Sequence, residues 1–241
     1  MISIKNKLFI LLLLITYILP LGGIGISSIN NSLSTNTNST KDDLNIDFYS
    51  NGSENGLNIF LYFDALPNDL AIEYSREVKA ETGIANIYYG LTNQELDPIE
   101  GNFLIIRKSD YLTIRKELMG LSIPILAKAS LYIGGGLNKH ETVVPSIELF
   151  SDLYDIRDIS GNYAVDDLYN AANQVWDTSS LLDLLNKNTV QSTGMHIQTG
   201  VQGKLLMLNV FANARYTFII EKEANSIASF PGLTIGMAYG F

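Results

Sequence analysis

The residues that could carry out catalysis or bind a metal are few, and their spacing matches no catalytic or metal motif. The two histidines are His140 and His196, and neither lies in an H-x-x-x-H or H-E-x-x-H pattern, which argues against a zinc site. The segment KHET places Glu141 and Thr142 beside His140, but it contains no His-x-Ser sequence. The glycines of YIGGGLN lack the Lys-Ser/Thr of a phosphate-binding loop. We therefore expect no enzyme, no catalytic residue, no cofactor and no metal.

A second group of polar residues recurs at every other position in segments whose alternate residues are apolar. In GMHIQTGVQGK, Met195 and Ile197 would face one way while His196 and Gln198 face the other. If such segments curl into a membrane barrel, the polar face becomes the interior, and its charges must pair because an unpaired interior charge is costly. The residues predicted to form this polar network in the lumen are Glu73, Lys128, His196, Lys204 and Arg215.

The totals fit such a barrel better than a cytosolic enzyme. The chain has 241 residues, no cysteine and a net charge of -9, which argues against nucleic acid as a partner. Charged residues make up 17%, against about 25% in ordinary soluble domains. Plentiful glycine (19) and tyrosine (13) suit many strands with aromatic girdles.

The period of two that dominates from residue 57 onward predicts an all-β, antiparallel, up-and-down transmembrane barrel. The candidate strands are 57–64, 69–78, 84–92, 101–108, 121–136, 193–204, 207–220 and 232–241. Several reach the length of about 9–11 residues that a tilted strand needs to cross a bilayer. We expect about eight strands, which would close the lumen; with ten strands the same polar residues would line a narrow channel. A soluble sandwich or barrel remains an alternative.

The first part of the chain predicts export. MISIKNKLFILLLLITYILPLGGIGISS has two lysines, an apolar run of about a dozen residues and small residues after it, which is the pattern of a secretory signal peptide. We assign 1–27 to this signal; the alternative is an uncleaved anchor helix. Residues 28–44, rich in Ser, Asn and Thr, are expected to form a disordered linker, and 45–241 to form the barrel domain.

A long insertion separates the last three predicted strands from the others. Within it, residues 148–187 break the alternation and contain apolar residues at helical spacing. We therefore expect 139–192 to form an extracellular loop with short helices. The connections 137–192 and 221–231 would then lie outside the cell, while the short turn near 204–207 would lie in the periplasm. The predicted connection 109–120 also falls on the periplasmic side, where turns are short, so its length does not fit this arrangement.

The end of the chain resembles the C-terminal signature of bacterial outer-membrane β-barrels of the small OmpA and OmpW type. In LTIGMAYGF the signature residues are Leu233, Ile235, Met237, Tyr239 and Phe241. The segments STGMHIQTGVQGKLLMLNVFANARYTF and LYIGGGLNKH also resemble hairpins and strand exits of such barrels. The resemblance implies an outer-membrane location, a strand recognised by the barrel-assembly machinery, and periplasmic chaperones and outer-membrane lipid as partners.

These observations predict a non-enzymatic outer-membrane protein that acts as a structural anchor, a surface-interaction protein or a narrow pore. One alternative is a lipid-modifying barrel enzyme, which a Ser or Thr within reach of His140 in a lipid-facing cleft would favour. The other is a secreted soluble β-sandwich or barrel that binds a ligand, which would bury its apolar faces against a second sheet.

Overall fold

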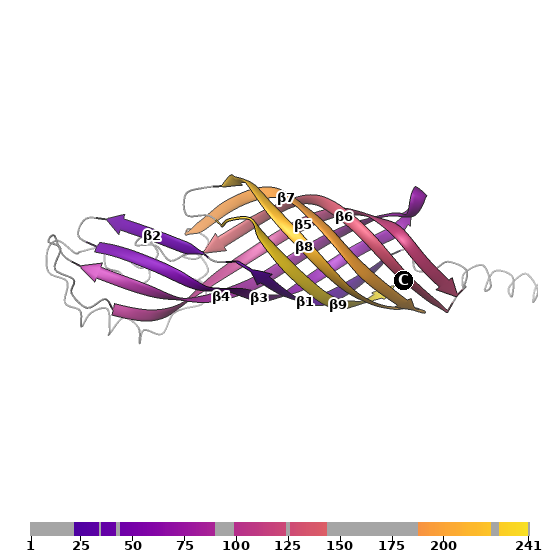
Figure 1. Cartoon of the computed structure of the whole chain (residues 1–241), viewed down its shortest axis with the longest axis horizontal. Coiled ribbons are helices and arrows are strands. Elements are labelled where there is room, and N and C mark those ends of the chain that lie inside the picture. The colour runs from indigo at the N-terminus through magenta and orange to yellow at the C-terminus, as the bar shows by residue number, and fades with distance from the viewer. Residues whose placement is uncertain are drawn as a thin grey trace, which may run out of the picture.

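The computed structural model describes residues 22–33, 35–41, 44–89, 99–123, 126–143, 188–222 and 227–240 (Figure 1). Its strands are β1 (Gly22–Ser32), β2 (Asn36–Lys41), β3 (Leu44–Leu66), β4 (Leu70–Tyr89), β5 (Ile99–Ile123), β6 (Ala127–Val143), β7 (Thr189–Leu205), β8 (Leu208–Lys222) and β9 (Phe230–Gly240). A short 3-10 turn, η1 (Pro67–Asp69), joins β3 to β4. In these ranges no helix has the length and hydropathy needed to cross a membrane.

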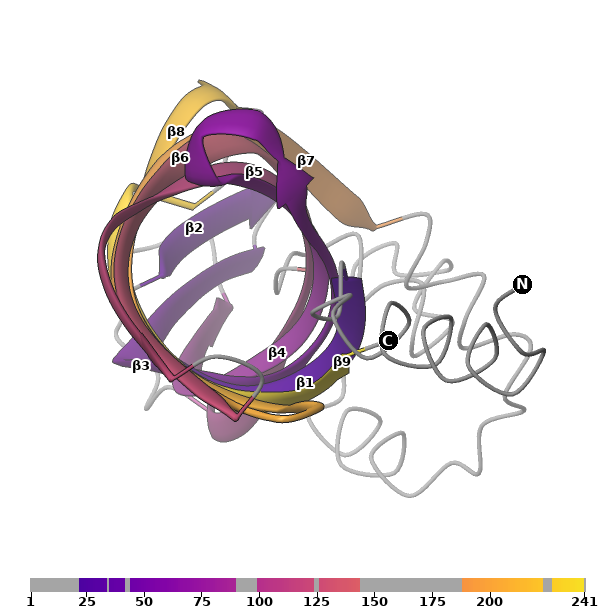
Figure 2. The ribbon, with the colours of Figure 1, turned by 90° about the vertical axis from the view of Figure 1, so that its right-hand side faces the viewer.

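Eight of these strands close into an antiparallel up-and-down barrel, which confirms the predicted fold class. The sheet runs in the order β1-β9-β8-β7-β6-β5-β4-β3-β2, and β1 also pairs with β3, so the sheet returns on itself (Figure 2). Strand β2 pairs with β3 outside the closed ring. Closure leaves no open edge in the ring, which is the condition for a sheet that lies in lipid.

The predicted number of strands was right, but three of the predicted segments do not correspond to single strands. The segment 121–136 combines the last residues of β5, which ends at Ile123, with the first part of β6, which begins at Ala127. The segments 69–78 and 84–92 belong to one strand, β4, which runs without a break from Leu70 to Tyr89. The prediction left residues 79–83 outside both segments, but they continue β4. Gly83 is buried there, and an added Cβ would come within 2.4 Å of the Phe48 ring. The missing eighth strand is β1, from a part of the chain assigned to the signal and the linker.

The disordered linker predicted at 28–44 is therefore wrong for its described part, which contains the end of β1 and all of β2. Polar residues of β1 form hydrogen bonds inside the barrel: Asn31 donates to Glu54 at 2.7 Å, and Ser27 accepts from Asn58 of β3 at 3.0 Å. The signal boundary at 27 also conflicts with β1, which begins at Gly22. Residues 1–21 lie outside the described residues, so the signal peptide itself stays a prediction.

Two predicted connections are shorter than expected. Residues 109–120 lie within β5, because the charged residues that suggested a loop alternate between the lumen and the outside. Strand β6 continues to Val143 and β7 begins at Thr189, so both ends of the insertion predicted at 139–192 are strand. The short helices expected between them lie outside the described residues.

The two ends of the barrel differ. One end, here the turn end, carries η1, Leu126 before the start of β6, and the turn at Leu206 and Met207. At the other end, the loop end, β1 reaches only to Ser53 of β3, and β6 reaches only to Ile106 of β5. Beyond these points β2 and the adjoining parts of β3, β4 and β5 (44–50, 83–89 and 99–105) continue as a sheet extension that stands clear of the barrel (Figure 1).

A bulge in β3 marks where the barrel passes into the sheet extension. The register between β3 and β4 shifts between Ser50 and Glu54. Gly52 lies in this bulge with φ at 76°, a conformation that glycine adopts readily and other residues do not.

Apolar side chains cover the outside of the barrel, and polar side chains fill its inside. Ile26, Val201 and Ile235 are 62%, 55% and 69% exposed, whereas the intervening Ser27, Gln202 and Thr234 are buried. This is the reverse of a soluble barrel, and no second sheet covers the apolar face of the described strands. The alternative of a soluble sandwich therefore does not fit the structure.

Candidate functional site

The half of the lumen nearer the loop end holds a connected series of buried ion pairs. The Glu77 carboxylate accepts from Arg215 at 2.6 Å and from Lys79 at 2.9 Å. Lys79 lies 3.8 Å from Glu54, which pairs with Arg107 at 2.8 Å. Apart from Arg215, whose side chain is 6% exposed, all of these side chains are fully buried. Strands β3, β4, β5 and β8 contribute these residues, so the ion pairs tie opposite walls together.

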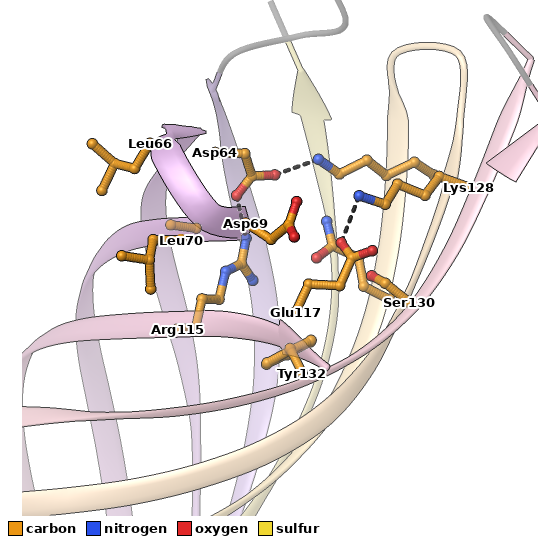
Figure 3. A pocket seen from close by; sticks show the side chains of 12 residues that line it. Asp64, Leu66, Asp69, Leu70, Arg115, Glu117, Lys128, Ser130 and Tyr132 are labelled. Carbon is orange, nitrogen blue, oxygen red and sulfur yellow. Dashed lines mark hydrogen bonds and ion pairs between the residues drawn. The ribbon is translucent and has the colours of Figure 1, made fainter. Parts of the chain in front are cut away.

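A second group of ion pairs lies nearer the turn end (Figure 3). Arg115 donates to Asp64 at 2.9 Å and lies 3.3 Å from Glu73. Asp64 also accepts from Lys204, which connects β3 with β7 across the lumen. Asp64, Arg115 and Lys204 line a cavity of about 230 Å³. Lys128 and Glu117, which form a further ion pair, line the same cavity.

The strands contribute equal numbers of inward-facing carboxylates and cations to the described lumen. The carboxylates are Glu54, Asp64, Glu73, Glu77, Glu81 and Glu117, and the cations are Lys79, Arg107, Arg115, Lys128, Lys204 and Arg215. Asp69 of the η1 turn adds one carboxylate at the lining of the cavity near the turn end. Glu81, which has no ion pair within hydrogen-bonding distance among the described residues, accepts a hydrogen bond from Thr35 at 2.9 Å. A low-dielectric interior stabilises such charges only when each one is compensated.

Tyr111 is the aromatic centre of the lumen. The guanidinium carbon of Arg215 lies 3.7 Å from the centre of its ring, a close cation–π contact. His140 and His196 meet the same ring edge-on, with ring centres 5.5 Å and 5.2 Å away. The ring is fully buried, so the middle of the barrel is filled with side chains.

Both histidines have a hydroxyl partner, but neither pair faces lipid. Ser109 Oγ lies 2.7 Å from His140 Nδ1, and Thr113 Oγ1 lies 2.9 Å from His196 Nε2. A Ser beside His140 is one part of the condition set for a lipid-modifying enzyme. The other part, a lipid-facing cleft, is not met, because Ser109 and His140 point into the lumen and are fully buried. The geometry gives a lipid substrate no approach to the hydroxyl.

An apolar cap lies over the ion pairs at the loop end. Leu33, Ile227 and Phe230 form a buried cluster, and the Phe230 ring lies 5.4 Å from Lys79 Nζ and 5.8 Å from the Arg107 guanidinium carbon. This cluster covers the cations with hydrocarbon. It therefore narrows the path between the lumen and the sheet extension.

The residues predicted for the lumen all lie on its inner side, but they do not pair with one another. Each of the four charged ones pairs instead with a residue that the prediction omitted, such as Glu77 for Arg215 and Arg115 for Glu73. The omitted residues of β4 were detectable: polar types occupy every second position from Glu73 to Glu81. Arg115 was missed because its segment looked like a loop, and Asp64 because it ends a predicted strand.

The residues of the predicted assembly signal lie along β9. Leu233, Ile235, Met237 and Tyr239 are between 54% and 69% exposed and face outward; Phe241 lies outside the described residues. Their recognition by assembly machinery stays a prediction. Among the described residues no cluster of three or more histidine, aspartate or glutamate side chains could hold a metal ion.

No protein-family model matches the chain, and the curated proteins compared with it give no match. Several solved barrels are similar in structure. The attachment invasion locus protein Ail of Yersinia pestis, solved with the heparin analogue sucrose octasulfate, is 12% identical, with a TM-score of 0.38 over 91% of this chain and 99% of that one. Neisserial surface protein A is 12% identical, with a TM-score of 0.41 over 91% and 97%. The N-terminal β-barrel domain of Pseudomonas aeruginosa OprF is 11% identical, with a TM-score of 0.39 over 91% and 97%. At these scores the likeness carries no inference about activity.

Proposed function

We propose that this chain is an outer-membrane protein whose barrel is a closed anchor, and that the sheet extension meets partners outside the cell. The observation that carries the proposal is the set of buried ion pairs in the lumen. In a water-filled pore the wall charges stay hydrated, but here Lys79, Glu77 and Arg107 have no exposed side-chain surface. Each is held by an ion pair, and the pair between Glu77 of β4 and Arg215 of β8 crosses the lumen, which favours an anchor over a narrow pore.

Three features support the membrane part of this proposal. The outside of the closed ring is apolar, as lipid requires. The start of the sequence resembles an export signal, and the final strand resembles the signature read by barrel-assembly machinery. Outer-membrane lipid, that machinery and periplasmic chaperones are accordingly the proposed partners. The role is non-enzymatic, since the one Ser–His pair of the described lumen is sealed from substrate.

A conductance measurement tests the closed barrel. We expect the purified full chain, reconstituted into planar phospholipid bilayers, to give no discrete current steps at neutral pH, because the ion pairs and the packed Tyr111 ring fill the lumen. A mobility shift between unheated and boiled samples in SDS establishes that the reconstituted barrel is folded. Regular current steps from folded protein would contradict the anchor and support the pore.

Cysteine labelling tests whether the sheet extension lies outside the cell. The chain contains no cysteine, so a single introduced thiol is unambiguous. We expect a membrane-impermeant maleimide to label a Tyr49→Cys variant on intact cells, because Tyr49 is 50% exposed on the sheet extension. The matched Leu206→Cys variant, 59% exposed in the wild type but at the turn end, should react only after the outer membrane is permeabilised. The reverse pattern would contradict surface display.

A further inference from the structure

The outer wall of the barrel has a hollow over β7 and β8. The cross-strand register aligns Ile133, Thr199, Ala214 and Leu233 in one row from β6 to β9. The small side chains of Thr199 and Ala214 lie between the larger Ile133 and Leu233, and all four residues line the hollow. The side chains of this row therefore project further from the barrel wall at its two ends than in its middle.

A larger pair of side chains closes the side of the hollow toward the loop end. Ile197 and Tyr216 are cross-strand partners in the next outward row, and both line the hollow. This open hollow has a volume of about 570 Å³, which falls within the range of about 300–1,000 Å³ that is usual for ligand sites.

The floor of the hollow is apolar even at Thr199, whose side chain carries a hydroxyl. Thr199 donates its hydroxyl to the backbone carbonyl of Tyr132 at 3.1 Å, so its polar group is satisfied within the wall and its methyl group remains for contact. A hydroxyl held in this way costs little in lipid. The hollow thus presents hydrocarbon on its floor and sides.

Polar groups lie at one edge of the hollow, on β1. Asn30 is the cross-strand partner of Leu233, and Ser32 lies in the following outward position. Asn30 donates to Asn55 at 2.7 Å and lies 3.4 Å from Ser53 Oγ, so a short band of neutral hydrogen-bonding groups borders the hydrocarbon. An apolar trough with such a border matches the junction between the acyl chain and the ester groups of a lipid.

We propose that this hollow is a specific site for one acyl chain of a phospholipid, with the ester region against Asn30 and Ser32. The proposal rests on the membrane-spanning barrel proposed above. A phospholipid suits the site because the hollow is concave, only two strands wide at its floor, and bordered by neutral groups without a cation among its outward-facing lining residues. A second copy of the barrel would present a broad convex wall, which could not pack closely against the floor of a trough only two strands wide.

Native mass spectrometry of the full chain tests the site. The protein is released from detergent micelles that contain dimyristoylphosphatidylethanolamine, and the ratio of lipid-bound to free protein is measured. We expect wild type to retain one phospholipid. Ala214→Leu fills the floor and should lower the ratio by about tenfold, the effect of losing roughly two buried CH2 contacts. Ala129→Leu makes the same change at an exposed site on β6 outside the hollow and should leave the ratio unchanged.

Two other results of the lipid measurement, and one of self-association, would count against the site. Equal ratios for the two variants, or no retained lipid in wild type, would overturn it. A dimer that Ala214→Leu abolishes while lipid binding is unaffected would assign the hollow to self-association. The mobility shift on boiling establishes that each variant is folded, and conductance of the same samples separates this proposal from the anchor. A conducting barrel that still retains lipid would contradict the anchor alone.

Discussion

Replacing Arg215 with Leu is expected to destabilise the barrel by about 3 kcal/mol or more, since breaking a buried ion pair leaves an uncompensated charge. Arg215 compensates the fully buried Glu77 at 2.6 Å and covers the Tyr111 ring. After the substitution Glu77 keeps only Lys79, which is shared with Glu54. The free energy of unfolding is measured by urea titration in phospholipid vesicles, followed by circular dichroism.

Arg76→Leu is the matched control for this prediction. Arg76 also pairs with a carboxylate, Asp110, at 2.7 Å, but its side chain is 54% exposed on the outside of the barrel. An ion pair between exposed side chains contributes little to stability, so this variant should stay close to wild type. Glu77→Gln in the Arg215→Leu background should recover part of the lost stability, because the orphaned charge is removed. Unchanged stability together with new conductance in Arg215→Leu would contradict the closed lumen.

Replacing Val201 with Lys is expected to cost about 2–4 kcal/mol, the penalty for a cation on the lipid face near the middle of the bilayer. Val201 is 55% exposed, and its cross-strand partners Leu131 and Ala212 are apolar. The same urea titration in vesicles measures the loss. In this position Lys would have only hydrocarbon beside its ammonium group.

Val78→Lys makes the identical change in a residue with the same exposed fraction, 55%. Val78 is the cross-strand partner of Lys108 and lies beyond Arg76 toward the loop end, where the exposed ion pairs mark the edge of the apolar band. Near the interface the penalty falls to about 0–1 kcal/mol. Equal losses for the two variants would mean that the outer wall has no depth-dependent lipid contact, which would contradict a membrane barrel.

The alternation of the sequence was sufficient to predict the fold class and the inner side of the lumen. Strands β7, β8 and β9 agree with prediction to within a few residues at each end, because lipid on one side and packed polar groups on the other impose a strict period of two. The same pattern placed Lys204 and Arg215 inside. A local pattern of this kind depends only on which side of a strand a residue occupies.

Other features depended on contacts between distant segments. The segment GIGISSINNS becomes β1 because it closes the ring between β3 and β9, and its Ser and Asn side chains find partners on β3. Gly83 continues β4 because the Phe48 ring occupies the space beside it. Neither reason is visible in a local window, where polar runs and glycines indicate linkers and turns.

The sequence by itself determined that this protein forms a barrel with an apolar outside and a polar inside, since that division follows from the order of residues along each strand. Only the tertiary structure decided which charges meet. Glu77 and Arg215 are separated by 138 positions in the chain but by 2.6 Å in the lumen. Barrel closure and strand stagger set that distance, and with it whether the polar inside is an open channel or a set of compensated ion pairs.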